Sequence, residues 1–175
     1  NALSLGSLYA LIAIGYTMVY GILRLINFAH GDVFMLGAYM AFYAITALAL
    51  PWGVAFIVAI GLTGILGMLL ERAAYRPLRD SPKISVMISA IGASFLIENV
   101  GIVVFGGRPK SFPSIALFDT VVRFGSVSVL SVSLFIPVIT IAVLVALLYI
   151  VNKTKTGLSM RAVSTDLDAA RLMAI

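Results

Sequence analysis

The sequence predicts an all-α integral membrane protein, and three observations lead to this prediction. Of the 175 residues, 62% are hydrophobic and only 11% are charged. A water-soluble domain of this size needs a larger polar fraction to cover its surface. The hydrophobic residues are gathered into five long runs, and the basic residues are concentrated in the connections between these runs. The apolar surface is therefore expected to face membrane lipid.

Five segments have the length and composition of membrane-spanning helices, because crossing the hydrocarbon takes about 20 mostly apolar residues. The predicted spans are about 3–23, 28–50, 54–70, 84–105 and 127–151. Pro51, Trp52 and Gly53 break the chain after the second span, and Pro137 is expected to kink the fifth helix rather than end it. Spanning strands are excluded, since each run is continuous and about twice the roughly ten residues that such a strand needs.

The connections divide the chain into a membrane bundle, residues 1–151, and a cytoplasmic segment, residues 152–175. The longest connection within the bundle is an external loop, about 106–126, where Val121, Val122, Val127 and Val129 are compatible with a short hairpin. Residues 152–175 are polar and basic at first. Thr165 or Asp166 is then expected to cap a short cytoplasmic helix.

The distribution of basic residues predicts the orientation in the membrane. With five crossings, nine of the twelve Lys and Arg residues fall on one side and three on the other. Basic residues accumulate in cytoplasmic connections, so the N-terminus is expected outside and residues 152–175 in the cytoplasm. This prediction depends on the second span, where Gly31 and Asp32 leave room for a bent or re-entrant start.

Composition and motifs exclude several classes of function. Cysteine is absent and His30 is the single histidine, which excludes disulfides, thiolate chemistry and a multi-histidine metal site. There is neither a Gly-x-Ser-x-Gly nucleophile turn nor a Gly-rich Lys-Ser/Thr phosphate loop. The net charge of +5 comes from residues that flank the apolar runs, which does not indicate nucleic-acid binding. We therefore expect neither an enzyme nor a cofactor.

Small residues recur at every fourth position in three of the predicted helices. The rows are Ala13, Thr17 and Gly21; Ala55, Ala59, Thr63 and Gly67; and Ser85, Ser89 and Ala93. Such rows let helices approach each other closely in lipid. They predict a compact bundle and do not identify a ligand.

Glu98 stands within a predicted span and is a candidate residue of a substrate pathway, together with the adjoining Asn99. A carboxylate at membrane depth costs a few kcal/mol and usually faces the bundle interior or a water-filled path. Ala90, Ser94 and Gly101 share its side of the helix by spacing. A structural hydrogen bond to a neighbouring helix is an equally acceptable interpretation.

A polar segment between the first two runs supplies two further pathway candidates, Asn27 and His30. A helix break at membrane depth is tolerated where it lines a cavity, and such breaks often form transporter sites. The alternative is a cytoplasmic turn, with Asn27 capping one helix and Asp32 the next. The residue pattern alone favours the turn.

Several long motifs resemble one family in order along the chain. Residues 6–21 (GSLYALIAIGYTMVYG) and 26–32 (INFAHGD) closely resemble the start of bacterial branched-chain amino acid ABC transporter permeases of the LivH type. Residues 71–79 (ERAAYRPLR), 88–92 and 157–175 continue the resemblance. It covers essentially the whole chain. Permeases of this family are longer, so the chain is expected to represent their N-terminal half.

The resemblance implies a set of partners in the bacterial inner membrane. These are a second permease subunit, two ATP-binding subunits and a periplasmic binding protein that delivers leucine, isoleucine or valine, or a related hydrophobic amino acid. The competing hypothesis is an ion-coupled secondary transporter or channel in which Glu98 titrates. That alternative requires no ATPase.

The resemblance also implies a cytoplasmic coupling loop that docks on the ATPase. Asp168, Ala169 and Ala170 resemble its Glu-Ala-Ala element, and Gly157 and Arg161 belong to the same resembling stretch. The sequence departs from the family pattern at two positions. Asp168 stands in place of the usual glutamate, and Ala174 stands where a glycine is ordinarily found.

Overall fold

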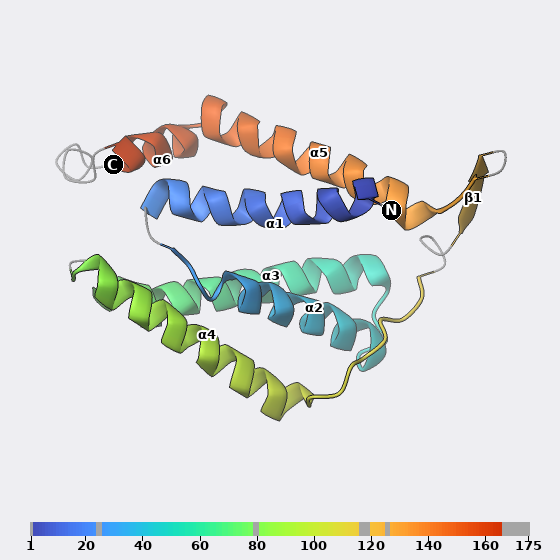
Figure 1. Ribbon diagram of the computed structural model, residues 1–175, viewed down its shortest axis with the longest axis horizontal. Coiled ribbons are helices and arrows are strands. Elements are labelled where there is room, and N and C mark those ends of the chain that lie inside the picture. The colour runs from blue at the N-terminus through green and yellow to red at the C-terminus, as the bar shows by residue number, and fades with distance from the viewer. Residues whose placement is uncertain (1, 24–25, 79–80, 116–119, 125–126, 166–175) are drawn as a thin grey trace. The chain divides into compact units, whose positions relative to one another are not determined.

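The computed structural model describes residues 2–23, 26–78, 81–115, 120–124 and 127–165, which belong to two compact units. Unit 1 contains α1 (Ala2–Leu23), β1 (Val121–Phe124), β2 (Val127–Leu130), α5 (Ser131–Lys153) and α6 (Lys155–Thr165). Unit 2 contains α2 (His30–Thr46), α3 (Trp52–Leu70), the π-helical turn η1 (Glu71–Tyr75), the 3-10 turn η2 (Arg76–Leu78) and α4 (Lys83–Phe105) (Figure 1).

Four of the described helices are long and apolar enough to cross a membrane. They are Ala2–Ile22, Trp52–Leu78, Lys83–Phe105 and Ser131–Lys153. Large apolar side chains cover their surfaces, with Leu3 at 73%, Ile57 at 72% and Val103 at 84% exposure. Water would disfavour so much exposed hydrocarbon, whereas lipid accommodates it. The prediction of an all-α integral membrane protein is thereby confirmed.

The second predicted span is shorter than the sequence suggested. A helix was expected over about 28–50, but α2 covers His30–Thr46. Its 17 residues extend about 25 Å, against about 30 Å of hydrocarbon. The helix does not resume before Pro51, because Ala49 has a positive φ of 50°, which lies outside the right-handed helical region. The count of five crossings therefore stays a prediction.

The fifth predicted span begins later than expected, because its first residues belong to a hairpin. Val121 pairs with Leu130 and Val122 with Val129 in an antiparallel two-stranded sheet. This confirms the hairpin and moves the start of the helix from about 127 to Ser131. The hydroxyl of Ser131 donates to the carbonyl oxygen of Thr120 at 2.7 Å. As expected, Pro137 does not end α5.

Helical structure also continues where a basic connection was expected. After α3, the chain forms η1 and η2 before α4 begins at Lys83. The connection between the third and fourth predicted spans is therefore largely an extension of the preceding helix. This extension carries Tyr75, whose hydroxyl takes part in the cluster described below.

Small residues form the contact between α2 and α3 in unit 2. Ala55 and Ala59 of α3 are buried, as are Ala41 and Ala44 of α2. A Cβ atom added at Gly37 of α2 would lie 2.9 Å from Thr63 Oγ1 of α3. Three members of the predicted row, Ala55, Ala59 and Thr63, therefore permit close helix packing. The fourth member, Gly67, has open space beside it.

In unit 1, α1 lies alongside α5 (Figure 1). Thr140 of α5 is buried, and its hydroxyl donates to the carbonyl oxygen of Ser7 at 3.3 Å. The same hydroxyl is 2.8 Å from the carbonyl oxygen of Ile136. A side chain that bonds its own helix and its neighbour fixes the register of the pair.

Candidate functional site

A group of hydrogen-bonded side chains surrounds the start of α2 in unit 2. The hydroxyl of Tyr75 in η1 donates to Asn27 Oδ1 at 2.6 Å. The hydroxyl of Ser94 in α4 donates to Asp32 Oδ2. We call Asn27, Asp32, Tyr75 and Ser94 the polar cluster. It holds Asn27, before the helix, against η1, and the first turn of α2 against α4.

The favoured turn is present, although it is stabilised differently from what was expected. Phe28 and Ala29 form a turn, and α2 begins at His30 with Ala29 in the capping position and no side-chain cap. The expectation that Asp32 caps the second helix is wrong, because Asp32 lies within the first turn of α2. The cap that Asn27 was expected to give the first helix adjoins residues 24 and 25, which lie outside the described residues, and stays a prediction. The side-chain oxygens of Asn27 and Asp32 accept hydrogen bonds from Tyr75 and Ser94, because tertiary partners are within reach and a local cap is not needed to satisfy them.

The polar cluster suits a membrane environment. Irregular backbone in a bilayer is tolerated only where it is buried in protein or lines a water-filled cavity. All four members of the cluster are partly buried, and Ala29 within the turn is completely buried. Hydrogen bonds between membrane helices contribute on average about 0.6 kcal/mol each. The cluster therefore positions the turn as well as stabilising it.

The four candidate pathway residues lie in two places in unit 2. Asn27 belongs to the polar cluster, and His30 begins α2 with a partly exposed side chain. Glu98 and Asn99 are exposed on α4, one turn beyond Ser94. The amide of Asn99 donates to the carbonyl oxygen of Phe95 at 2.7 Å. Among the residues that the structure describes, none pairs with the Glu98 carboxylate.

Sequence reasoning missed Tyr75 and Ser94 as members of the site. Each is an ordinary residue on a helix, and its partner lies 48 or 62 positions away. A weak signal was available for Ser94, which shares its side of α4 with the buried residues Ala90 and Gly101. A polar side chain on a buried stripe needs a partner.

An aromatic cluster occupies the other end of α2, and it too was missed. The rings of Tyr39 and Phe105 stack with centroids 4.5 Å apart. Lys110 donates a hydrogen bond to the hydroxyl of Tyr43, and its Nζ lies 4.6 Å from the centre of that ring. Lys110 thereby ties the segment after α4 to α2 through hydrogen-bonding and cation–π contacts.

Gly157, a candidate coupling residue, forms the corner between α5 and α6 in unit 1. A Cβ atom there would lie 2.3 Å from the carbonyl oxygens of both Ile150 and Val151. Thr154 completes the corner, because its hydroxyl donates to the Ile150 carbonyl at 2.6 Å and accepts from the Gly157 N–H at 3.1 Å. Thr154 thus caps the N-terminus of α6. Only glycine permits so close an approach.

The described part of the coupling segment ends with α6. Thr165 was expected to cap a following helix, but it is the last residue of α6, and its hydroxyl donates back to the carbonyl oxygen of Arg161 at 2.9 Å. Asp166, the alternative cap, lies outside the described residues. So do three coupling candidates, Asp168, Ala169 and Ala170.

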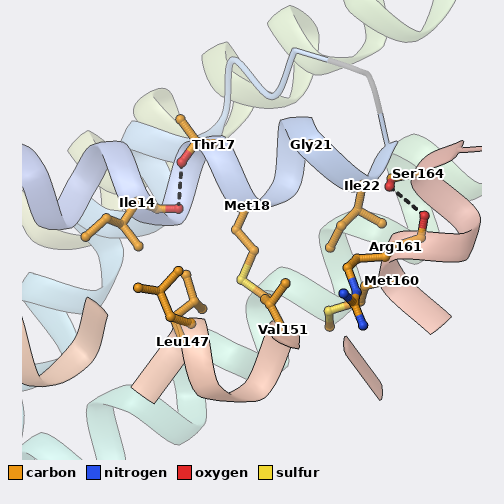
Figure 2. A pocket seen from close by; sticks show the side chains of 11 residues that line it. Ile14, Thr17, Met18, Gly21, Ile22, Leu147, Val151, Met160, Arg161 and Ser164 are labelled. Carbon is orange, nitrogen blue, oxygen red and sulfur yellow. Dashed lines mark hydrogen bonds between the residues drawn. The ribbon is translucent and has the colours of Figure 1, made fainter. Parts of the chain in front are cut away.

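Arg161, the remaining coupling candidate, lines a groove between α1, α5 and α6 with a volume of about 290 Å³. Figure 2 shows Met18 of α1 reaching toward Val151 of α5, with Arg161 and Met160 of α6 beside them. Among the described residues, none that lines the groove carries a carboxyl group. Its arrangement indicates binding of an apolar group near a cation rather than acid–base chemistry.

Comparison with known proteins identifies a family across the whole chain. Residues 1–175 match the branched-chain amino acid transport system / permease component family. The chain is 39% identical to the high-affinity branched-chain amino acid transport system permease protein BraD of Pseudomonas aeruginosa. It is also 39% identical to the permease protein LivH of Escherichia coli K12 and to that of Salmonella typhimurium.

These similarities cover all of this chain but only 60 or 61% of each relative. The chain thus spans about three fifths of the length of the curated relatives it matches. No solved structure matches it.

Proposed function

Because the chain belongs to the family of branched-chain amino acid transport system permease components, we propose that it is part of the permease subunit of an ABC importer. The importer carries branched-chain or related hydrophobic amino acids across the bacterial inner membrane. The match of all 175 residues to a transport family is the observation that carries this proposal. That family is one of permeases and not of enzymes.

The fold is consistent with this role. Four long apolar helices make the chain a multi-pass membrane protein, and the cysteine-free sequence offers no thiol chemistry. In the proposed importer, the chain binds no nucleotide itself. It pairs with a second permease subunit, receives its amino acid from a periplasmic binding protein and is driven by two ATP-binding subunits.

We assign the polar cluster to the substrate pathway. Asn27 and His30 flank a turn that Tyr75 and Ser94 hold in place through hydrogen bonds, and polar turns of this kind are sites where transporters bind cargo. Glu98 and Asn99 face outward from α4, where a second subunit or further helices of the same subunit would complete the path.

We assign α6 and the residues that follow it to coupling with the ATPase. The tight corner at Gly157 fixes the direction in which α6 leaves α5, so a push on the coupling segment would be transmitted to the end of a spanning helix. Arg161 and the element Asp168, Ala169 and Ala170 are the proposed contacts. Such a mechanism requires two helix arrangements that ATP binding and hydrolysis interconvert.

Charge reversal tests the coupling assignment. We expect Arg161→Glu and Asp168→Lys to lower leucine uptake by about tenfold or more, since disrupting a charge across an interface weakens docking strongly. Lys83→Glu, which reverses an exposed charge at the start of α4, is the matched control and should leave uptake near normal. Membrane levels of all variants should be equal.

Co-purification tests the importer itself. An ATP-binding subunit should be recovered with the tagged full-length gene product. Normal uptake by both charge-reversal variants would contradict the coupling assignment alone. The absence of any ATPase from the purified complex would contradict the importer.

A further inference from the structure

The groove of unit 1 is complementary to an anionic phospholipid, because its walls are largely apolar and a cationic side chain lies at one end. Its apolar walls come from Ile14, Met18 and Ile22 of α1, Leu147 and Val151 of α5, and Met160 of α6. Arg161 supplies the charge. We propose that this groove binds an anionic phospholipid, with one acyl chain along α1 and α5 and the headgroup phosphate at Arg161.

The polar atoms of the groove other than Arg161 are already used within the protein. The hydroxyl of Thr17 donates to the carbonyl oxygen of Ile14 at 3.1 Å, and that of Ser164 donates to the carbonyl oxygen of Arg161 at 2.8 Å (Figure 2). Neither hydroxyl presents its proton to the groove. An acyl chain can therefore occupy the groove without leaving the two hydroxyl groups without hydrogen bonds.

The dimensions of the groove fit a segment of acyl chain. From Ile14 to Ile22 the lining of α1 rises by eight residue steps, or about 12 Å along the helix. A volume of about 290 Å³ lies just below the range for ligand pockets, roughly 300–1,000 Å³. The groove therefore accommodates a narrow chain rather than a bulky solute.

The charge around the groove selects an anionic headgroup. Ile22 and Val151 lie in the last turns of their helices, where a spanning helix reaches the headgroup region. Lys153, Lys155 and Arg161 are all exposed there, and the described residues of unit 1 include no Asp or Glu that would neutralise them. Basic pockets between membrane helices bind anionic lipid headgroups. A zwitterionic lipid would gain less from this site.

Native mass spectrometry of the full-length gene product tests the proposal. The delipidated protein is offered phosphatidylglycerol or phosphatidylcholine with identical acyl chains. We expect at least about fivefold greater retention of phosphatidylglycerol, the effect of one basic side chain at an anionic surface. Arg161→Gln should remove most of this preference and Arg161→Lys should keep most of it. Arg72→Gln, which changes another exposed arginine but in unit 2, should not alter it.

Filling the groove tests the position of the acyl chain. Met18→Trp, or the milder Ile14→Phe if the first variant fails to fold, should reduce retention of both lipids. Equal retention of the two lipids by the wild type would overturn the proposal. The proposal would also be overturned if the preference survived Arg161→Gln, or if inorganic phosphate alone competed with the lipid. Unchanged retention in both groove-filling variants would overturn it too, and would indicate that other polypeptide covers the groove. None of these readouts depends on transport.

Discussion

At the scale of single residues, the hydrogen bond between Asp32 and Ser94 is the contact that joins α2 to α4 at the proposed pathway. Both side chains are partly buried, so neither can exchange its partner freely for water. A pair of this kind is worth more for positioning than for stability, because membrane hydrogen bonds contribute little on average.

A double-mutant cycle measures this pair. Asp32→Ala and Ser94→Ala should each destabilise the protein, and their coupling energy should be about 1 kcal/mol, within the range found between membrane helices. The measurement is unfolding of the full-length gene product by sodium dodecyl sulfate, followed by circular dichroism. Ser89, which donates to the carbonyl oxygen of Ala74, supplies the control. A cycle of Asp32→Ala with Ser89→Ala should show coupling near zero, and equal coupling in the two cycles would refute the assignment.

The sequence shows which residues are polar, but it does not show which of them contact each other in the fold. Asn27 and His30 stood out because they interrupt two apolar runs. Tyr75 and Ser94 did not, because their significance comes from partners 48 and 62 positions away. Periodicity reports which side of a helix a residue occupies, and it carries no information about the neighbouring helix.

At the scale of elements, the corner between α5 and α6 is the most constrained part of unit 1. Gly157→Ala should destabilise the protein by about 1–3 kcal/mol, the usual cost of overpacking, because its Cβ would collide with two carbonyl oxygens of α5. Gly61→Ala in α3 is the matched control, since nothing lies within 4 Å of its added Cβ. Detergent unfolding curves compare the two. A Gly157→Ala protein as stable as the control would show that the corner is not as tight as described.

Long helices were predictable and their ends were not. Four of the five predicted runs correspond to helices long enough to cross a membrane, because length and hydropathy determine insertion. The chain does not resume a helix between α2 and Pro51 because Ala49 has a positive φ, and the late start of α5 depends on pairing between Val122 and Val129. Both helix ends depend on backbone geometry and non-local contacts, which cannot be predicted from the length of an apolar run.

At the scale of the whole molecule, the topology depends on whether the short helix α2 crosses the membrane. If it does, the N-terminal end and the segment 106–115 lie on the same side; if it does not, they lie on opposite sides. These 175 residues contain no cysteine, so each single-cysteine variant places one thiol at a known position in this part of the protein. We predict that an impermeant maleimide reaches Leu3→Cys and Ser114→Cys in intact spheroplasts, and Thr156→Cys only after permeabilisation. Protection of Leu3→Cys alongside labelling of Ser114→Cys would mean four crossings.

The source of energy for transport tests the central claim most directly. The full-length gene product, reconstituted in liposomes with its co-purified partners and binding protein, should accumulate labelled leucine only when ATP is supplied at the ATPase side. Vanadate should abolish this accumulation, and an imposed proton or sodium gradient should not replace ATP. Accumulation driven by such a gradient without ATP, and lost on Glu98→Gln, would contradict the importer and favour an ion-coupled transporter.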